Sequence, residues 1–97
     1  MRVPTPPPKP KDPAVSIIIG VYNEERYIEA ALQSLLDQTF EDFEVIVVDD
    51  CSTDSSVEIV RTFDDPRIRL LENDENLGLT RSLNRALDAA KGKYIAR

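Results

Sequence analysis

The sequence has no histidine and only one cysteine, Cys51. Without histidine, any acid–base catalysis would depend on carboxylates, Lys, Tyr or a metal-bound group. A lone cysteine cannot form an internal disulfide, which suits a reducing cytosol. The sequence also lacks an apolar run of about 18 residues and a basic segment leading into an apolar one. It therefore predicts neither a membrane span nor a signal peptide.

Basic residues are scarce relative to acidic ones. The 97 residues carry 18 acids and 12 bases, for a net charge of −6, and the bases form no patch. An acidic surface repels phosphates, so the composition argues against nucleic-acid binding. The 41% of apolar residues is enough for the core of one small domain.

The first 14 residues differ in composition from the rest and hold six of the seven prolines. Such a segment favours extended chain that cannot bury a core. It could dock a proline-reading domain, but a disordered tether or leader is the reading we prefer. The folded domain is expected over residues 15–97.

Apolar β-branched runs alternate with helical periodicity from Val15 onward. Strands are predicted at 15–19, 43–48 and 68–71, with a fourth beginning at 93–97. A helix is predicted at 24–38, with Tyr27 and Ile28 in its apolar stripe. A second follows the N-cap candidates Ser52, Thr53, Asp54 and Ser55 and ends before Asp65-Pro66. Residues 73–78 form a polar loop, and a third helix has Leu79 on its apolar face and ends at a Gly92 cap. Ser55 and Glu58 have capping-box spacing.

This order predicts an α/β fold with a parallel sheet. Strands joined by crossover helices pair in parallel, and we expect a sheet ordered 3-2-1-4 with helices on both faces. Ligands bind such sheets beyond the carboxyl ends of the strands, where the strand order reverses. The candidate site therefore lies beside the first strand, at residues 20–24 and at Asp49-Asp50.

Asp49 and Asp50 come at the end of the predicted apolar strand, whose only charged residue is Glu44. They could simply cap the following turn. Two adjacent carboxylates repel each other, however, and a ligand donor or a cation would offset that repulsion. For Asp50 we favour ligand binding, whereas for Asp49 the two roles are balanced. Tyr22 is placed to stack on a flat base. Neither the dinucleotide fingerprint nor a P-loop is present.

Three separated blocks resemble family 2 glycosyltransferases. They are residues 15–24 (VSIIIGVYNE), residues 34–54 (SLLDQTF, then FEVIVVDDCSTD), and Asn76-Leu77-Gly78 followed by Asn84, Ala86, Ala90, Gly92, Tyr94 and Ile95. The resemblance covers residues 15–97. It implies the GT-A fold with its three-layer, Rossmann-like half, a nucleotide-diphospho-sugar donor, UDP-sugar first, and inversion at the anomeric carbon.

The resemblance also implies a role for individual residues. Tyr22 would stack on the base, Asp50 would accept a hydrogen bond from it, and Glu24 and Asp49 would support the base and ribose. The wall near the diphosphate would be formed by Asn76, Gly78, Arg81 and Asn84. Gly20 would have a backbone role only.

One family element is not in the sequence. The strand that starts at Lys93 would continue into an Asp-x-Asp motif holding Mg²⁺ or Mn²⁺, but the sequence stops at Arg97. The metal ligands and the general base are expected beyond Arg97. We therefore expect no catalytic residue and no metal site in these 97 residues, and an isolated fragment that is inactive.

Two other hypotheses follow from the sequence. A flavodoxin-like signalling or interaction module could use Asp50 as a phosphate acceptor, although the required lysine and hydroxyl residues on later strands are missing. An unfinished sheet edge could pair two copies as a homodimer or swapped assembly. We expect a cytoplasmic location, with membrane association possible for the parent protein.

Overall fold

Strands and helices alternate along the chain in the computed structural model, which describes residues 12–92 and 94–96. The expected tether at 1–14 lies almost entirely outside the described residues. In chain order the elements are β1 (Val15–Val21), α1 (Ile28–Leu36), β2 (Phe43–Asp49), α2 (Ser56–Arg61), β3 (Ile68–Glu72), α3 (Leu79–Ala89) and β4 (Tyr94–Ala96). The predicted α/β class is confirmed.

The strands form one parallel sheet in which neighbours hydrogen-bond in the order β3-β2-β1-β4. β1 and β2 pair along their whole length, from Val15 opposite Phe43 to Val21 opposite Asp49. β4 pairs only with residues 15–17 of β1. Strand β2 is central, and every one of its residues is buried, including Glu44 and Asp49, as expected of a mainly apolar strand covered on both faces.

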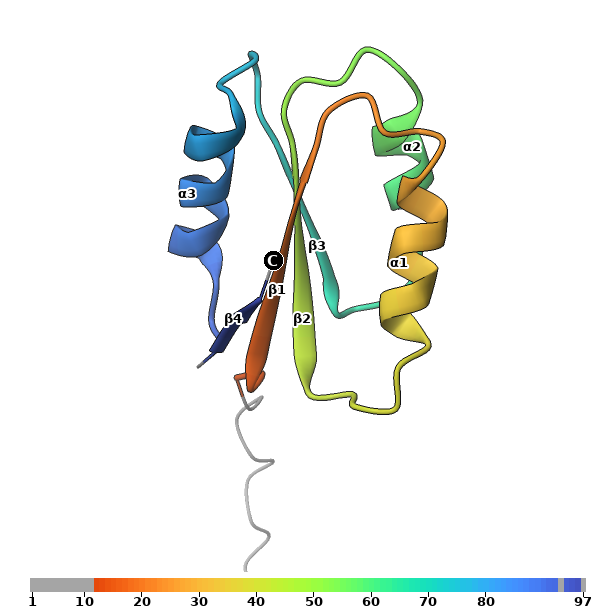
Figure 1. Cartoon of the computed structure of the whole chain (residues 1–97), viewed down its shortest axis with the longest axis vertical. Helices are drawn as coiled ribbons and strands as arrows, with labels where there is room; N and C mark the ends of the chain where they lie inside the picture. The colour runs from red at the N-terminus through yellow and green to blue at the C-terminus, as the bar shows by residue number, and fades with distance from the viewer. Residues whose placement is uncertain (1–11, 93, 97) are drawn as a thin grey trace, which may run out of the picture.

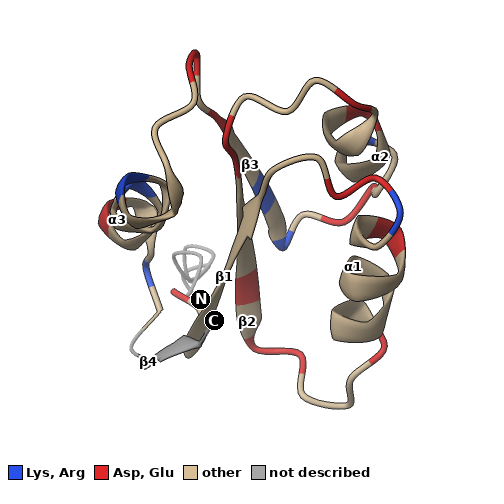
Figure 2. Ribbon diagram, turned by 45° about the horizontal axis from the view of Figure 1, so that its top comes forward, with Lys and Arg blue, Asp and Glu red and all other residues tan. Residues whose placement is uncertain are grey.

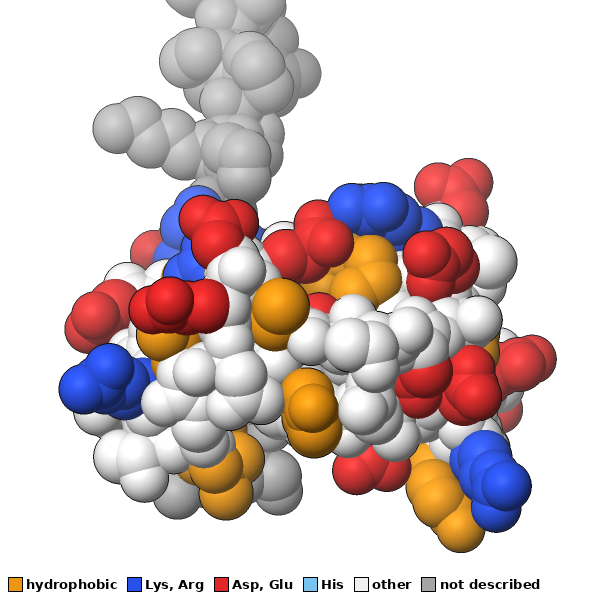
Figure 3. All heavy atoms as spheres, turned by 90° about the horizontal axis from the view of Figure 1, so that it is seen from above, with side chains coloured by type: hydrophobic (Ala, Val, Ile, Leu, Met, Phe, Trp, Pro, Cys, Tyr) orange, Lys and Arg blue, Asp and Glu red, His pale blue; other side chains and the backbone are white. Residues whose placement is uncertain are grey.

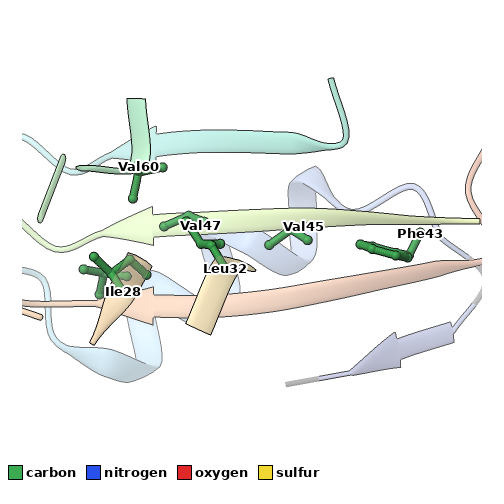
Figure 4. Packing of buried hydrophobic residues seen from close by; sticks show 7 residues of the cluster. Ile28, Leu32, Phe43, Val45, Val47 and Val60 are labelled. Carbon is green, nitrogen blue, oxygen red and sulfur yellow. The ribbon is translucent and has the colours of Figure 1, made fainter. Parts of the chain in front are cut away.

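The helices cover both faces of the sheet (Figure 1): α1 and α2 lie on one side and α3 on the other. On the first side, Ile28 and Leu32 of α1 pack over Val45 and Val47 of β2 (Figure 4). On the second side, Ala86 of α3 packs with a smaller cluster that includes Ile46 and Val48. No helix within the described ranges is long and apolar enough to cross a bilayer.

The first helix is shorter than the sequence predicts. Residues 24–27 form a turn in which the N–H of Ile28 bonds to the carbonyl of Glu24, and α1 begins only at Ile28. Tyr27, placed in the buried stripe by periodicity, is 67% exposed. The apolar spacing predicts the helix correctly from Ile28 onward. The conformation of the preceding turn is set instead by hydrogen bonds to the loop after β2 and to the first residue of α2.

The two predicted helix caps have different outcomes. Ser55 is the N-cap residue of α2, as predicted, but its side chain makes no capping hydrogen bond. Helix α3 ends at Ala90, which is extended, rather than at Gly92. Gly92 is needed for another reason: a Cβ there would lie 2.5 Å from the backbone nitrogen of Ser16. Only glycine lets the chain approach β1 this closely.

Candidate functional site

The carboxyl ends of β1, β2 and β3 lie at one end of the molecule, and the loops that follow them carry many acidic residues (Figure 2). Seen onto this end, basic side chains lie at the periphery (Figure 3). The loops cover residues 22–27, 50–55 and 73–78. This is the edge at which parallel α/β sheets bind ligands.

A cavity of about 320 Å³ opens between these loops and α3. Six of the eight residues that line it were placed at the site by the sequence: Gly20, Val21, Tyr22, Glu24, Asp50 and Asn76. The other two lining residues are Leu79 and Ser82. Tyr22 is 49% exposed and Leu79 is 67% exposed, so two apolar surfaces are available at its opening.

Asp50 is the buried acid of the cavity, with 7% of its surface exposed. Its Oδ1 accepts hydrogen bonds from Asn73 Nδ2 (3.0 Å) and the N–H of Leu77 (2.7 Å), and its Oδ2 accepts one from the N–H of Gly78 (3.0 Å). The bond from Asn73, followed by that from Leu77, lowers the pKa of Asp50 and outweighs the effect of burial. Asp50 is therefore an ionised acceptor that also holds loop 73–78.

Asp49 has a different environment although it is adjacent. Its Oδ1 accepts from the hydroxyl of Ser52 and its Oδ2 from the N–H of Ser52 at 3.0 Å. This is the turn-capping arrangement that short acids adopt after a strand. Asp49 does not belong to the cavity lining that the described residues form.

The loops after β1 and β2 are tied together by hydroxyl and carboxylate groups. The backbone N–H of Asn23 donates to Ser52 Oγ and that of Glu24 to Ser56 Oγ, both at 2.9 Å. In return Asn23 Oδ1 accepts from the N–H of Thr53 at 2.9 Å. Ser52 and Thr53, two of the N-cap candidates in the sequence, therefore help to position the loop that carries Tyr22 and Glu24.

The remaining predicted residues lie around the cavity in different ways. Gly78 contacts Asp50 through its N–H and has φ 87°, a backbone conformation that favours glycine. Arg81 and Asn84 are exposed on α3 and are not among the described lining residues. Leu79 and Ser82 line the cavity but were missed, because helical periodicity assigned Leu79 to the core.

The described residues contain no group of three or more His, Cys, Asp or Glu side chains that could hold a metal ion. Asp49 and Asp50 already accept hydrogen bonds from their own loops. The described residues therefore do not fit a metal centre.

A parallel α/β sheet with a polar cavity beyond β1 and β2 defines a nucleotide-binding class of fold. The profile of the family described as glycosyl transferase family 2 matches residues 16–97. The chain belongs to this family.

Relatives of the chain include proteins described as glycosyltransferases and a succinoglycan biosynthesis protein. It is 41% identical over 87 residues to an uncharacterized glycosyltransferase of Haemophilus influenzae, covering 88% of this chain and 27% of that protein. It is 40% identical over 91 residues to the succinoglycan biosynthesis protein ExoO of Rhizobium meliloti, covering 94% and 26%. The chain thus spans only about a quarter of the length of these relatives.

Solved structures with the same fold include complexes with nucleotide sugars. The mannosyltransferase PcManGT of Pyrobaculum calidifontis, in complex with GDP-Man and Mn²⁺, superimposes with a TM-score of 0.79 at 35% identity, covering 88% of this chain and 26% of that one. TarS of S. aureus in complex with UDP-GlcNAc gives 0.79 at 38% identity, covering 84% and 24%. These neighbours confirm the expected GT-A type of fold.

Proposed function

We propose that this chain is the nucleotide-binding part of an enzyme that transfers a sugar from a nucleotide-diphospho-sugar to an acceptor hydroxyl, with inversion. The observation that carries the proposal is the cavity at the carboxyl ends of β1 and β2, where an exposed aromatic ring, Tyr22, and an ionised buried acid, Asp50, line the same space. A flat base with N–H donors needs these two groups, since one stacks and the other accepts.

Each lining residue has a role in this proposal. Tyr22 stacks on the base, and Asp50 accepts from it beside its internal donors, since each carboxylate oxygen can accept more than one hydrogen bond. Glu24 accepts from the ribose hydroxyls. Asp49 acts indirectly, by holding the turn at Ser52.

The diphosphate side of the donor is assigned to four residues. Asn76 lines the cavity, and its Nδ2 lies 3.5 Å from the carbonyl oxygen of Asp50. Gly78 supports the same wall. Arg81 and Asn84, exposed on α3, would reach the phosphates from outside the described cavity.

We further propose that the metal ligands and the general base of the enzyme lie in parts of the protein outside these 97 residues. The chain covers 25–34% of the relatives' length, and a family neighbour holds Mn²⁺ together with GDP-Man. On this proposal Mg²⁺ or Mn²⁺ serves the whole enzyme, and the isolated chain binds nucleotide without turning over a donor.

A UDP-sugar is the donor class that we propose first. The complex of TarS with UDP-GlcNAc supports it, and the complex of PcManGT with GDP-Man makes GDP the natural comparison. The alternative of Asp50 as a phosphate acceptor has less support, because its carboxylate is buried and accepts three hydrogen bonds.

The test is an NMR titration of the 97-residue chain with UDP and with GDP, each with and without Mn²⁺. We expect the amide signals of Tyr22 and Asp50 to shift with UDP at millimolar concentration. Tyr22→Ala should weaken binding about tenfold, given the usual contribution of base–aromatic stacking. Phe40→Ala is the matched control, since Phe40 is 52% exposed but lies in the loop before β2, at the opposite end of the sheet.

Asp50→Asn should also weaken binding, whereas Asp88→Asn on the exposed side of α3 should not. If neither nucleotide shifts Tyr22 or Asp50, the proposed nucleotide site is wrong. If GDP binds and UDP does not, the site stands and the donor class changes.

Self-association and location are separate proposals. Beyond residues 15–17, the outer edge of β1 has no strand partner among the described residues, and we propose that two copies pair there. Light scattering at high concentration should show a dimer; a clean monomer would contradict it. We also propose a cytoplasmic location with membrane association of the whole protein, to be checked by cell fractionation.

A further inference from the structure

Asn73, the first residue after β3, joins three groups around the cavity without lining it. Its Nδ2 donates to Asp50 Oδ1 (3.0 Å) and to Ser82 Oγ (2.9 Å). Its Oδ1 accepts from Arg85 NH1 at 2.7 Å. The side chain is buried, with 6% of the residue exposed. All of its hydrogen-bonding atoms are therefore directed by neighbours.

Arg85 determines which way the Asn73 amide faces. An arginine side chain only donates, so the atom opposite it must be the amide oxygen, and the NH₂ group must face Asp50 and Ser82. Arg85 itself is anchored, since the same NH1 also donates to the carbonyl oxygen of Glu72 at 2.8 Å. The contact thus links an exposed side chain of α3 to the end of β3.

The opposite amide orientation would be unfavourable for Asp50. It would place the Asn73 carbonyl oxygen against the buried carboxylate. Asp50 would then face a second acceptor where it now has a donor. Asp50 forms no ion pair with a described residue. Its charge therefore depends on hydrogen-bond donors, which are the N–H groups of Leu77 and Gly78 and the side chains of Asn73 and Ser82, with Asn73 contributing most.

We propose that Asn73 and Arg85 are positioning residues of the nucleotide site, which orient the Asp50 carboxylate toward the cavity and keep it a pure acceptor. This inference rests on the proposed nucleotide function. It adds residues outside the cavity to the determinants of nucleotide affinity. The lowered pKa of Asp50, to which the bond from Asn73 contributes most, agrees with it.

The experiment uses the 97-residue chain with UDP or GDP, whichever binds more tightly. Arg85→Gln should weaken the nucleotide about tenfold, since a hydrogen bond to a charged group has roughly that effect. Arg85→Lys keeps a charged donor and should restore most of the affinity. Arg61→Gln is the control: Arg61 is also exposed and also contacts Glu72, through the carboxylate at 2.6 Å, but it does not contact Asn73.

A second measurement follows the pKa of Asp50 by the NMR shift of its carboxyl carbon, without nucleotide. Asn73→Asp places a second carboxylate against Asp50 and should raise this pKa, so that nucleotide binding weakens further as the pH falls toward 5. The titratable and charged groups on the elements around Asp50, which Asn73→Asp leaves in place, are Glu24, Asp49, Glu72, Asp74, Glu75, Arg81 and Arg85.

The outcomes separate the two proposals. If the wild-type chain binds nucleotide and Arg85→Gln binds it equally well with an unchanged Asp50 pKa, the positioning roles are wrong and the nucleotide site stands. Failure of Arg85→Lys to restore affinity would likewise overturn them. If the wild-type chain binds neither nucleotide, the proposed function is wrong, whatever Asn73→Asp does to the pKa.

Discussion

Glu44, in the first half of β2, is a buried carboxylate that ties the end of α3 to the sheet. Its Oε2 accepts from Ser16 Oγ (2.6 Å) and from the N–H of Lys91 (2.7 Å). Its Oε1 accepts from Arg69 NH1 (3.1 Å), which also donates to the carbonyl oxygen of Ala89. With 6% of the residue exposed, these partners replace water, and Glu44→Gln should destabilise the fold.

The size of the destabilisation follows from the hydrogen bonds that a glutamine at position 44 can still make. Its single oxygen can still face Ser16 and Lys91, but its NH₂ group must then face Arg69, so one charge-assisted bond is lost and two are weakened. A hydrogen bond to a charged group contributes about 1.5–3 kcal/mol. Because the Arg69 side chain is 37% exposed, we expect about 2 kcal/mol, or a fall in Tm of about 8–15 °C for a domain of this size.

The effect should depend on pH with a definite sign. Burial raises the pKa of Glu44, but the hydrogen bonds from Ser16, Lys91 and Arg69 outweigh it and hold the pKa below its ordinary value of 4.5. A lowered folded-state pKa stabilises above the unfolded pKa, and the contribution is lost as the pH falls through the folded pKa. Wild type and Glu44→Gln should therefore converge in stability in acid.

The assay is urea unfolding followed by circular dichroism, at neutral pH and at several values below about pH 4.5. Glu75→Gln, an exposed glutamate in the loop before α3, is the control and should stay within about 0.5 kcal/mol of wild type. An equal deficit for Glu44→Gln at neutral and acid pH would refute the reasoning, since the charge would then have no part in it.

Three further substitutions test the loops and connections by the same unfolding assay. Gly92→Ala should cost about 3 kcal/mol, because its Cβ would lie 2.5 Å from the backbone nitrogen of Ser16; wild-type stability would show that the close approach is wrong. Gly78→Ala should cost about 2 kcal/mol through its φ of 87° alone, since a Cβ there meets nothing within 4 Å; a neutral result would contradict that strain. Ser56→Ala should cost about 1–2 kcal/mol and speed amide exchange at Glu24, whose N–H donates to the Ser56 hydroxyl; unchanged exchange there would disprove the contact's importance.

The fold could be predicted because its signals are short-range. Residues 43–48 are apolar except for Glu44, which predicts a strand buried on both faces, and all of β2 is buried. The start of α1 could not be read this way. Glu24 and Glu25 suit a helix N-terminus by type, but the N–H of Glu25 donates to Asp54 Oδ2 at 3.2 Å, across 29 positions. A contact between loops decides the conformation there, and no local pattern encodes it.

The residues of the candidate site also fall into those that element order predicts and those that depend on contacts between distant segments. Tyr22, Glu24 and Asp50 were found because strand ends of a parallel sheet meet at one edge, a rule that needs only the element order. Asn73 was read simply as part of a polar loop, since its partners Asp50 and Arg85 lie 23 positions before and 12 after it. Its importance appears only when all three elements are placed together.

Those distant contacts explain why the two adjacent acids after β2 are not equivalent. Asp49 satisfies its carboxylate within its own turn, at Ser52, whereas Asp50 takes all three of its N–H donors from loop 73–78. The same carboxylate that lines the cavity therefore fixes the loop forming its opposite wall. Polar bonds also fix the loop carrying Tyr22, so both walls are ordered before any ligand arrives. Because ordering loops on binding reduces affinity, a site built this way should bind the nucleotide with little loss to ordering, and loosening either wall should weaken binding without removing a single ligand contact.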